Sequence, residues 1–111
     1  MTLRDFQDLN NSRAYSEEAK TKWGDCRTRT LQDWAIYTGG EAGELLNAVK
    51  KLCMDPQPQH AIAGLERDVV DEAVDVITYA FLLIDFIGLD VQVELLRKFD
   101  EVSERIGWSR A

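Results

Sequence analysis

The sequence DVVDEAVDVITYAFLLIDFIG, residues 68–88, decides the fold. Acidic residues crowd its first half, whereas residues 76–87 are apolar nearly all the way round a helix. We therefore expect a helix that begins near Ala61 or Leu65, ends at Ile87, and is closed by Gly88 in a left-handed conformation. A monomeric bundle in which every helix keeps one solvated face does not explain such a helix, so the pattern predicts a homo-oligomer.

Three further helices are expected around this segment. Apolar residues recur at helical spacing over residues 2–10, 30–54 and 90–107. No segment shows the alternation of apolar and polar residues that is typical of strands. The sequence thus predicts an all-α fold of four main helices, in a single domain that covers residues 1–111.

Several signals interrupt the helical pattern. Gly39 and Gly40 predict a kink in the second helix or a close approach of another backbone. Residues 11–30 are interpreted as irregular, and the proline-rich segment 55–59 as a linker. The only histidine, His60, is assigned to this linker, which argues against a di-iron bundle or a phosphotransfer domain, because both need a histidine on a helix.

Composition restricts the classes of function. The 111 residues include 13 Lys and Arg against 20 Asp and Glu, so the net charge is −7, which argues against binding of a nucleic-acid polymer. The longest apolar stretch, residues 76–89, is short and contains Asp85, so no membrane span is expected. Cys26 and Cys53 form no CxxC pair, which indicates neither a zinc site nor a redox motif. We expect a cytoplasmic protein with reduced thiols.

Two acidic pairs differ from the others in their surroundings. Glu41 and Glu44 in the second helix, and Glu72 and Asp75 in the third, are spaced so that each pair presents both carboxylates on one face. Five pairs with this spacing occur, close to the number expected by chance, so solvated surface acids are one interpretation. In the other, the two pairs meet across a helix interface and hold a divalent cation. Oxygen ligands favour Mg²⁺, with Mn²⁺ as a substitute.

The same acids carry a resemblance to a known family. Residues 40–45 (GEAGEL) and 71–76 (DEAVDV) resemble the two acidic motifs of the MazG-type nucleotide pyrophosphohydrolases, which belong to the all-α NTP pyrophosphatase superfamily. Residues 98–105 (KFDEVSER) are similar to the basic motif in the last helix of the smaller members. Gly40 stands where many relatives have a glutamate, and Asp100 where similar proteins often carry Asn. The resemblance covers most of the chain and implies a four-helix MazG-like bundle that assembles as a homodimer or homotetramer.

The resemblance also implies an activity. A nucleoside triphosphate would be hydrolysed between its α and β phosphates to give the monophosphate and pyrophosphate, with Mg²⁺ held by Glu41, Glu44, Glu72 and Asp75. Of these, Glu44 is the candidate general base.

Other residues are candidates for holding the nucleotide. Lys51 lies two turns after Glu44 and is either a phosphate ligand or a solvated lysine. Further candidates are Lys98 and Arg105 for phosphate, and Trp23, Tyr79 and Asp100 for the base or sugar. Aromatic residues at helical spacing are more often core residues, so core packing remains open for Trp23 and Tyr79, and Trp34 is assigned to the core.

A different class of function is also compatible with these patterns. The chain would then be a non-catalytic helical oligomer that binds nucleotides or protein partners, and its acids would form a solvated face. Pyrophosphate release from a nucleotide panel distinguishes the two classes.

Overall fold

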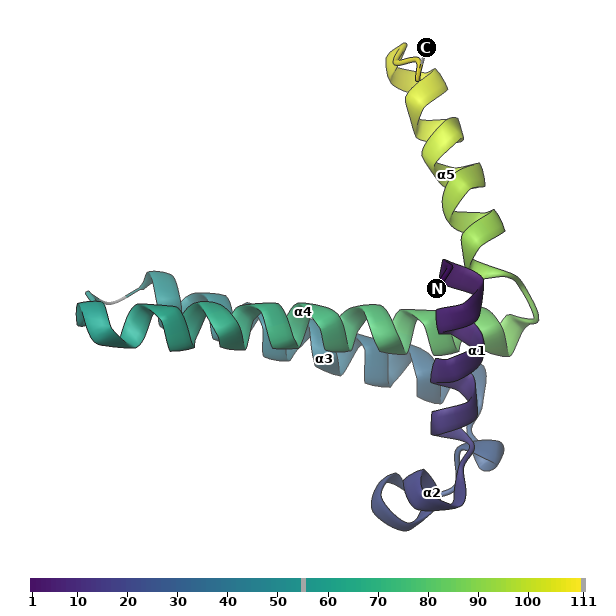
Figure 1. The fold of residues 1–111 in the computed structure, drawn as a ribbon, viewed down its shortest axis with the longest axis horizontal. Coiled ribbons are helices and arrows are strands. Elements are labelled where there is room, and N and C mark those ends of the chain that lie inside the picture. The colour runs from purple at the N-terminus through teal and green to yellow at the C-terminus, as the bar shows by residue number, and fades with distance from the viewer. Residues whose placement is uncertain (55, 111) are drawn as a thin grey trace.

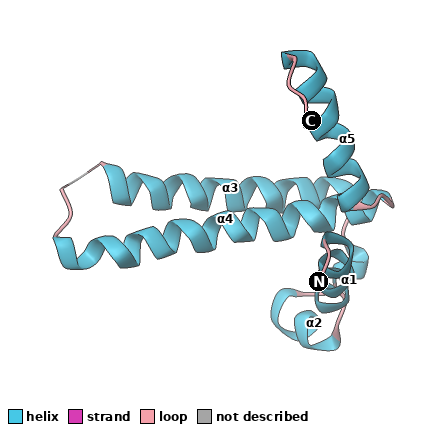
Figure 2. Ribbon diagram, turned by 45° about the horizontal axis from the view of Figure 1, so that its top comes forward, coloured by secondary structure: helices cyan, strands magenta, loops and turns pink. Residues whose placement is uncertain are grey.

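The computed structural model describes residues 1–54 and 56–110, and this part of the chain is all-helical (Figures 1 and 2). Two long helices, α3 and α4, form a hairpin. The shorter helices α1 and α2 lie at the end of this hairpin that is remote from the α3–α4 turn, and α5 leads away from the same end. The described α-helices are α1 (Leu3–Ala14), α2 (Glu17–Trp23), α3 (Leu31–Cys53), α4 (Gln59–Ile87) and α5 (Val91–Ile106), with a 3₁₀ turn over Cys26–Thr28.

Helix α3 begins at a capping box and runs without interruption. The Thr30 side chain accepts a hydrogen bond from the backbone N–H of Asp33, and the Asp33 carboxylate accepts one from the N–H of Thr30. The predicted close approach of another backbone at Gly39 and Gly40 is wrong, because a Cβ on either would meet no atom within 4 Å, and α3 continues as a helix through both residues. Packing along α4 sustains the helix despite the low helix propensity of glycine.

Helix α4 begins earlier than predicted. Pro58 occupies its N-cap, so Gln59 and His60 lie in the first turn, and the assignment of His60 to the linker is wrong. Proline suits this place, since its missing N–H would have no intrahelical partner there. Asp55, the first residue of the predicted linker, lies outside the described residues. The expected end is confirmed: Gly88 has φ 89° and closes α4 in the left-handed conformation.

The predicted irregular segment 11–30 contains a helix. Helix α1 extends to Ala14 rather than to residue 10, and Ser16 then caps α2 by accepting a hydrogen bond from the N–H of Ala19. The described chain therefore has five α-helices, namely the four predicted ones and the short α2. Helix α2 has only 7 residues, too few for an apolar stripe to stand out against its charged side chains.

The core lies where α1 and the 3₁₀ turn meet the α3–α4 hairpin. Trp34 is 1% exposed and packs with Ala14, Cys26 and Leu82, so its assignment to the core is confirmed. Tyr37, Tyr79 and Leu83 border this cluster. Outside it, the side chains are largely half-buried or exposed. Among the described helices, none is long and apolar enough to cross a bilayer.

Candidate functional site

Three carboxylates from two helices meet on the α3–α4 hairpin. Glu41 of α3 and Glu72 and Asp75 of α4 each offer an oxygen atom, and these three atoms lie within 4.8 Å of one another. Side chains three residues apart share a helix face, so Glu72 and Asp75 both reach towards α3. We call these three residues the acidic cluster.

The acidic cluster is electrostatically unfavourable without a cation. Partial burial, followed by repulsion from Asp75, Glu72 and Glu44, raises the pKa of Glu41 above its ordinary value. The pKa of Glu72 is raised by desolvation and then by Asp75 and Glu44. A bound proton or a divalent cation relieves this repulsion, and a set of carboxylate oxygens suits Mg²⁺ or Mn²⁺.

Glu44 lies beside the acidic cluster rather than in it. It is exposed and lines a small groove of about 90 Å³ together with Lys51, Asp68 and Glu72. Glu72 is therefore shared between this groove and the acidic cluster. Because Lys51 lines the same groove, the structure brings it close to two of the predicted metal ligands.

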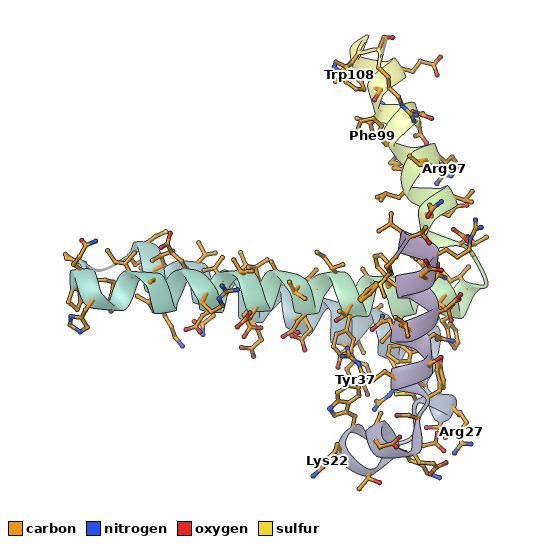
Figure 3. The ribbon with its side chains drawn as sticks, viewed as in Figure 1. Lys22, Arg27, Tyr37, Arg97, Phe99 and Trp108 are labelled. Carbon is orange, nitrogen blue, oxygen red and sulfur yellow. The ribbon has the colours of Figure 1, made fainter. Side chains whose placement is uncertain are left out.

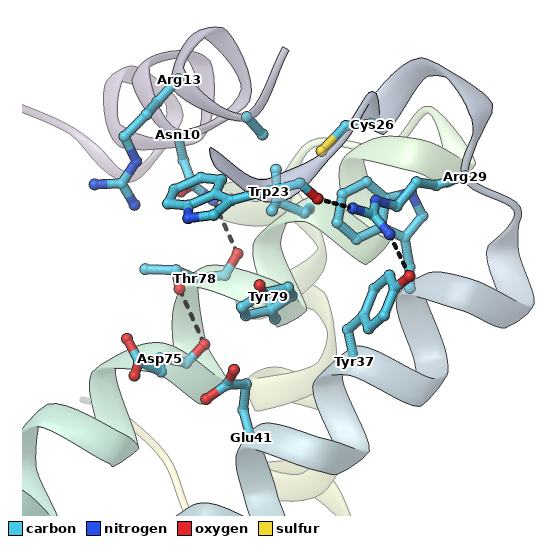
Figure 4. Close-up of a pocket in the computed structure, with 13 residues that line it drawn as sticks. Asn10, Arg13, Trp23, Cys26, Arg29, Tyr37, Glu41, Asp75, Thr78 and Tyr79 are labelled. Carbon is cyan, nitrogen blue, oxygen red and sulfur yellow. Dashed lines mark hydrogen bonds between the residues drawn. The ribbon is translucent and has the colours of Figure 1, made fainter. Parts of the chain in front are cut away.

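A larger cavity opens on the other side of the acidic cluster. It measures about 500 Å³, and Glu41 and Asp75 lie in its wall. Figure 4 shows these two carboxylates at one side of the cavity, with the ring of Tyr79 next to them and Trp23 beyond it. The structure thus brings both predicted base-binding aromatics into one cavity with two predicted metal ligands.

Trp34 and Tyr37 add two further aromatic rings to the wall of this cavity. The ring centroids of Trp34 and Tyr79 are 6.4 Å apart, and those of Tyr37 and Tyr79 are 6.3 Å apart. Burial, followed by the nearby charge of Glu41, raises the pKa of the Tyr79 hydroxyl, so it stays neutral at physiological pH. A planar apolar ligand would find stacking surfaces here.

The cavity also contains two arginines that the sequence patterns did not single out. Arg13 comes from α1, and its guanidinium carbon lies 5.8 Å from the centroid of the Trp23 ring. Arg29 follows the 3₁₀ turn, donates a hydrogen bond of 2.6 Å to the carbonyl oxygen of Trp23, and donates another to the Tyr37 hydroxyl. Neither residue belongs to a helical stripe or a motif, so periodicity gave no signal for them.

Three predicted residues lie away from the acidic cluster in the single chain. Lys98 and Arg105 are both on α5, which leads away from the hairpin, and both form ion pairs with Glu101. Asp100 accepts a hydrogen bond from Arg110 instead of facing the cavity. Figure 3 shows the same separation: Phe99 and Trp108 mark the outer part of α5, and Tyr37 lies near the far end of α1.

Comparison of the chain with family models, with curated proteins and with solved structures finds no significant match.

Proposed function

We propose that this chain is a Mg²⁺-dependent nucleoside triphosphate pyrophosphohydrolase of the MazG-like kind. One observation carries the proposal: a carboxylate cluster with the donor chemistry of a magnesium site borders a cavity that is lined by aromatic rings and two guanidinium groups. A nucleotide combines the three matching chemistries, namely a polyphosphate for the metal, a flat base for the aromatic rings, and hydrogen-bond acceptors for the arginines.

Each residue of the acidic cluster and its surroundings has a role in this proposal. Glu41, Glu72 and Asp75 would hold the cation, which supplies charge neutralisation at the phosphates and lowers the pKa of a bound water. Glu44 lies one helical turn after Glu41 and next to Glu72, in position to accept the proton of the attacking water. Lys51 in the same groove would donate to an outer phosphate oxygen.

The base would lie in the larger cavity. Trp23 and Tyr79 offer stacking faces, and the neutral Tyr79 hydroxyl does not repel the phosphates beside it. Trp23 is about half exposed, so its ring is free to cover a base that enters from solvent.

We further propose that the chain works as a homodimer or homotetramer. Its radius of gyration is 17.1 Å, whereas a compact domain of this length has about 13 Å. Helix α5 is strongly amphipathic, yet Leu95, Leu96 and Phe99 are about half exposed. A second copy packed on this face would bury it, and Lys98 and Arg105 could reach a nucleotide only if that packing placed them beside another copy's acidic cluster. The predicted roles of these two residues require such an arrangement.

The proposed activity is tested by product analysis of Asp75→Asn beside the wild-type chain. Each protein is incubated with the four canonical dNTPs, with Mg²⁺ or with EDTA, and the monophosphate and pyrophosphate are quantified. We expect Mg²⁺-dependent formation of both products by the wild type and a loss of more than about 100-fold in Asp75→Asn, because a carboxylate ligand of the cation is removed.

Asp71→Asn is the matched control, since it makes the same change one turn earlier on α4 and outside the acidic cluster. It should keep most of the activity. Equal turnover by Asp75→Asn and wild type would contradict the site assignment. No turnover of any nucleotide by the wild type would favour a non-catalytic binding module, which the exposed apolar face of α5 also suits.

A further inference from the structure

Among the described residues, neither arginine of the cavity has a carboxylate partner, whereas five of the other six arginines do, with Arg67 as the exception. This chain carries 20 acidic residues, yet among the described residues neither Arg13 nor Arg29 forms an ion pair. Paired arginines elsewhere are Arg4, Arg27, Arg97, Arg105 and Arg110. Each guanidinium has five N–H donors. Arg13 uses none of them in a hydrogen bond to another described residue, whereas Arg29 already donates to the Trp23 carbonyl oxygen and the Tyr37 hydroxyl, so the donors available to a ligand are those of Arg13 and the remaining ones of Arg29.

Besides the two arginines, the cavity wall contains another donor, and this one has no acceptor. Trp34 is 1% exposed and lines the cavity, and its indole Nε1–H lacks a hydrogen-bond partner among the described residues. A buried N–H without an acceptor carries an uncompensated desolvation cost. An acceptor on a ligand would remove this cost after a small movement of the ring.

The surroundings of these donors favour a flat group over a phosphate. The Arg29 guanidinium carbon lies 4.5 Å from the centroid of the Tyr37 ring and 5.9 Å from that of Trp34, and Arg13 lies over Trp23. Figure 4 shows both guanidiniums across the cavity from the carboxylates of Glu41 and Asp75, with Tyr79 between them. If a metal holds the phosphates at the carboxylates, the group that reaches the arginines is the base.

Taking the proposed function as a premise, we infer that this site selects nucleotides whose base carries a carbonyl oxygen where adenine and cytosine carry an amino group. It therefore prefers guanine over adenine, and uracil over cytosine. Guanidinium and indole groups only donate hydrogen bonds. The O6 and N7 atoms of guanine, or the O4 atom of uracil, can accept them, whereas the amino groups of adenine and cytosine present further donors. Of these donors the Trp34 N–H is buried, so a base that leaves it unpaired is disfavoured.

The test compares bases of the same ring size. For the wild type with Mg²⁺, kcat/KM is measured for dGTP against dATP and for dUTP against dCTP. Binding of the corresponding monophosphates in EDTA is followed by tryptophan fluorescence, which does not depend on turnover. For whichever pair is hydrolysed faster, the purines or the pyrimidines, we expect the oxo base, which is the one with the carbonyl oxygen, to be favoured over the amino base by about tenfold or more in both measurements.

Two variants test whether the residues of this cavity determine the preference for the oxo base. Arg13→Gln should reduce the oxo-to-amino ratio to about threefold or less, because it replaces a guanidinium that makes no hydrogen bond to other described residues by a shorter, neutral amide with fewer N–H donors. The matched control, Lys22→Gln, removes the same charge from an exposed position outside the cavity and should keep the ratio.

Three results would overturn the inference. The first is a wild type that favours the amino base or shows no preference. The second is an equal loss of kcat/KM for all four nucleotides in Arg13→Gln, which would place a phosphate rather than the base at the arginines. The third is a Lys22→Gln control that loses the ratio as fully as Arg13→Gln. If no nucleotide is hydrolysed but the monophosphates still bind with the oxo preference, the base site stands and the proposed hydrolase activity fails.

Discussion

At the scale of single residues, the acidic cluster makes a distinct contribution to the pH dependence of stability. The pKa values of Glu41 and Glu72 are raised above the ordinary 4.5, so the folded chain takes up these protons more readily than the unfolded chain does. The contribution of these two groups to stability is therefore greatest below pH 4.5 and is lost as pH rises through their raised pKa values.

Glu72→Gln tests this sign directly. The variant lacks one of the repelling charges. In EDTA, the melting temperature of the variant minus that of the wild type should therefore be larger at pH 8 than at pH 4. Adding Mg²⁺ at pH 8 should raise the melting temperature of the wild type more than that of the variant. Thermal unfolding followed by circular dichroism provides the measurement, with Glu18→Gln on α2 as the control. A difference that does not change with pH would show that the cluster is not under repulsion.

At the scale of elements, one buried side chain joins three helices. The amide of Gln7 in α1 donates hydrogen bonds of 3.0 Å to the Asp85 carboxylate and 2.9 Å to the Leu89 carbonyl oxygen. Its oxygen accepts one of 2.7 Å from the backbone N–H of Val91, at the start of α5. Gln7 is 6% exposed, so these bonds are protected from water.

Replacing this residue should loosen the joint between α1, α4 and α5. Gln7→Ala leaves the Val91 N–H and the Leu89 carbonyl without their partner, and we expect the free energy of unfolding to fall by about 2–3 kcal/mol. Urea denaturation measures this change. Gln32→Ala, at an exposed position of α3, should change it by less than about 0.5 kcal/mol. A similarly small change for Gln7→Ala would show that packing alone holds α1 in place.

The long helices could be predicted from sequence, whereas the arrangement of the shorter ones could not. Helical spacing of apolar residues located both ends of α3 and α5 to within a residue, and the left-handed Gly88 located the end of α4. Pairs of acids spaced by three were also visible. By contrast, the position of α1 depends on the hydrogen bonds of Gln7, and that position brings Arg13 into the cavity. Such long-range contacts produce no periodic pattern in the sequence.

At the scale of the whole molecule, the chain has an extended shape with little fully buried surface. Among the described residues, Trp34 is the only large side chain that is less than 2% exposed. Helix α5 extends from one end of the hairpin, and its apolar face has few contacts within the chain (Figure 1). Assembly with another copy would supply the missing burial.

Leu96→Glu is the variant that tests this assembly. It places a charge on the apolar face of α5, where Leu96 is 48% exposed, so the proposed dimer or tetramer should dissociate to monomers at micromolar concentration. Light scattering coupled to size-exclusion chromatography gives the mass. Glu104→Gln on the same helix should leave the oligomer intact. A monomeric wild type would refute the proposed assembly.

The proposed activity requires that the acidic cluster hold a divalent cation. Titration of the wild type with Mn²⁺, followed by electron paramagnetic resonance of the free ion, measures this property without any substrate. We predict saturable binding at or below millimolar Mn²⁺, competition by Mg²⁺, and at least about tenfold weaker binding by Glu72→Gln. Equal binding by the wild type and Glu72→Gln, or no binding by the wild type up to several millimolar, would contradict the account.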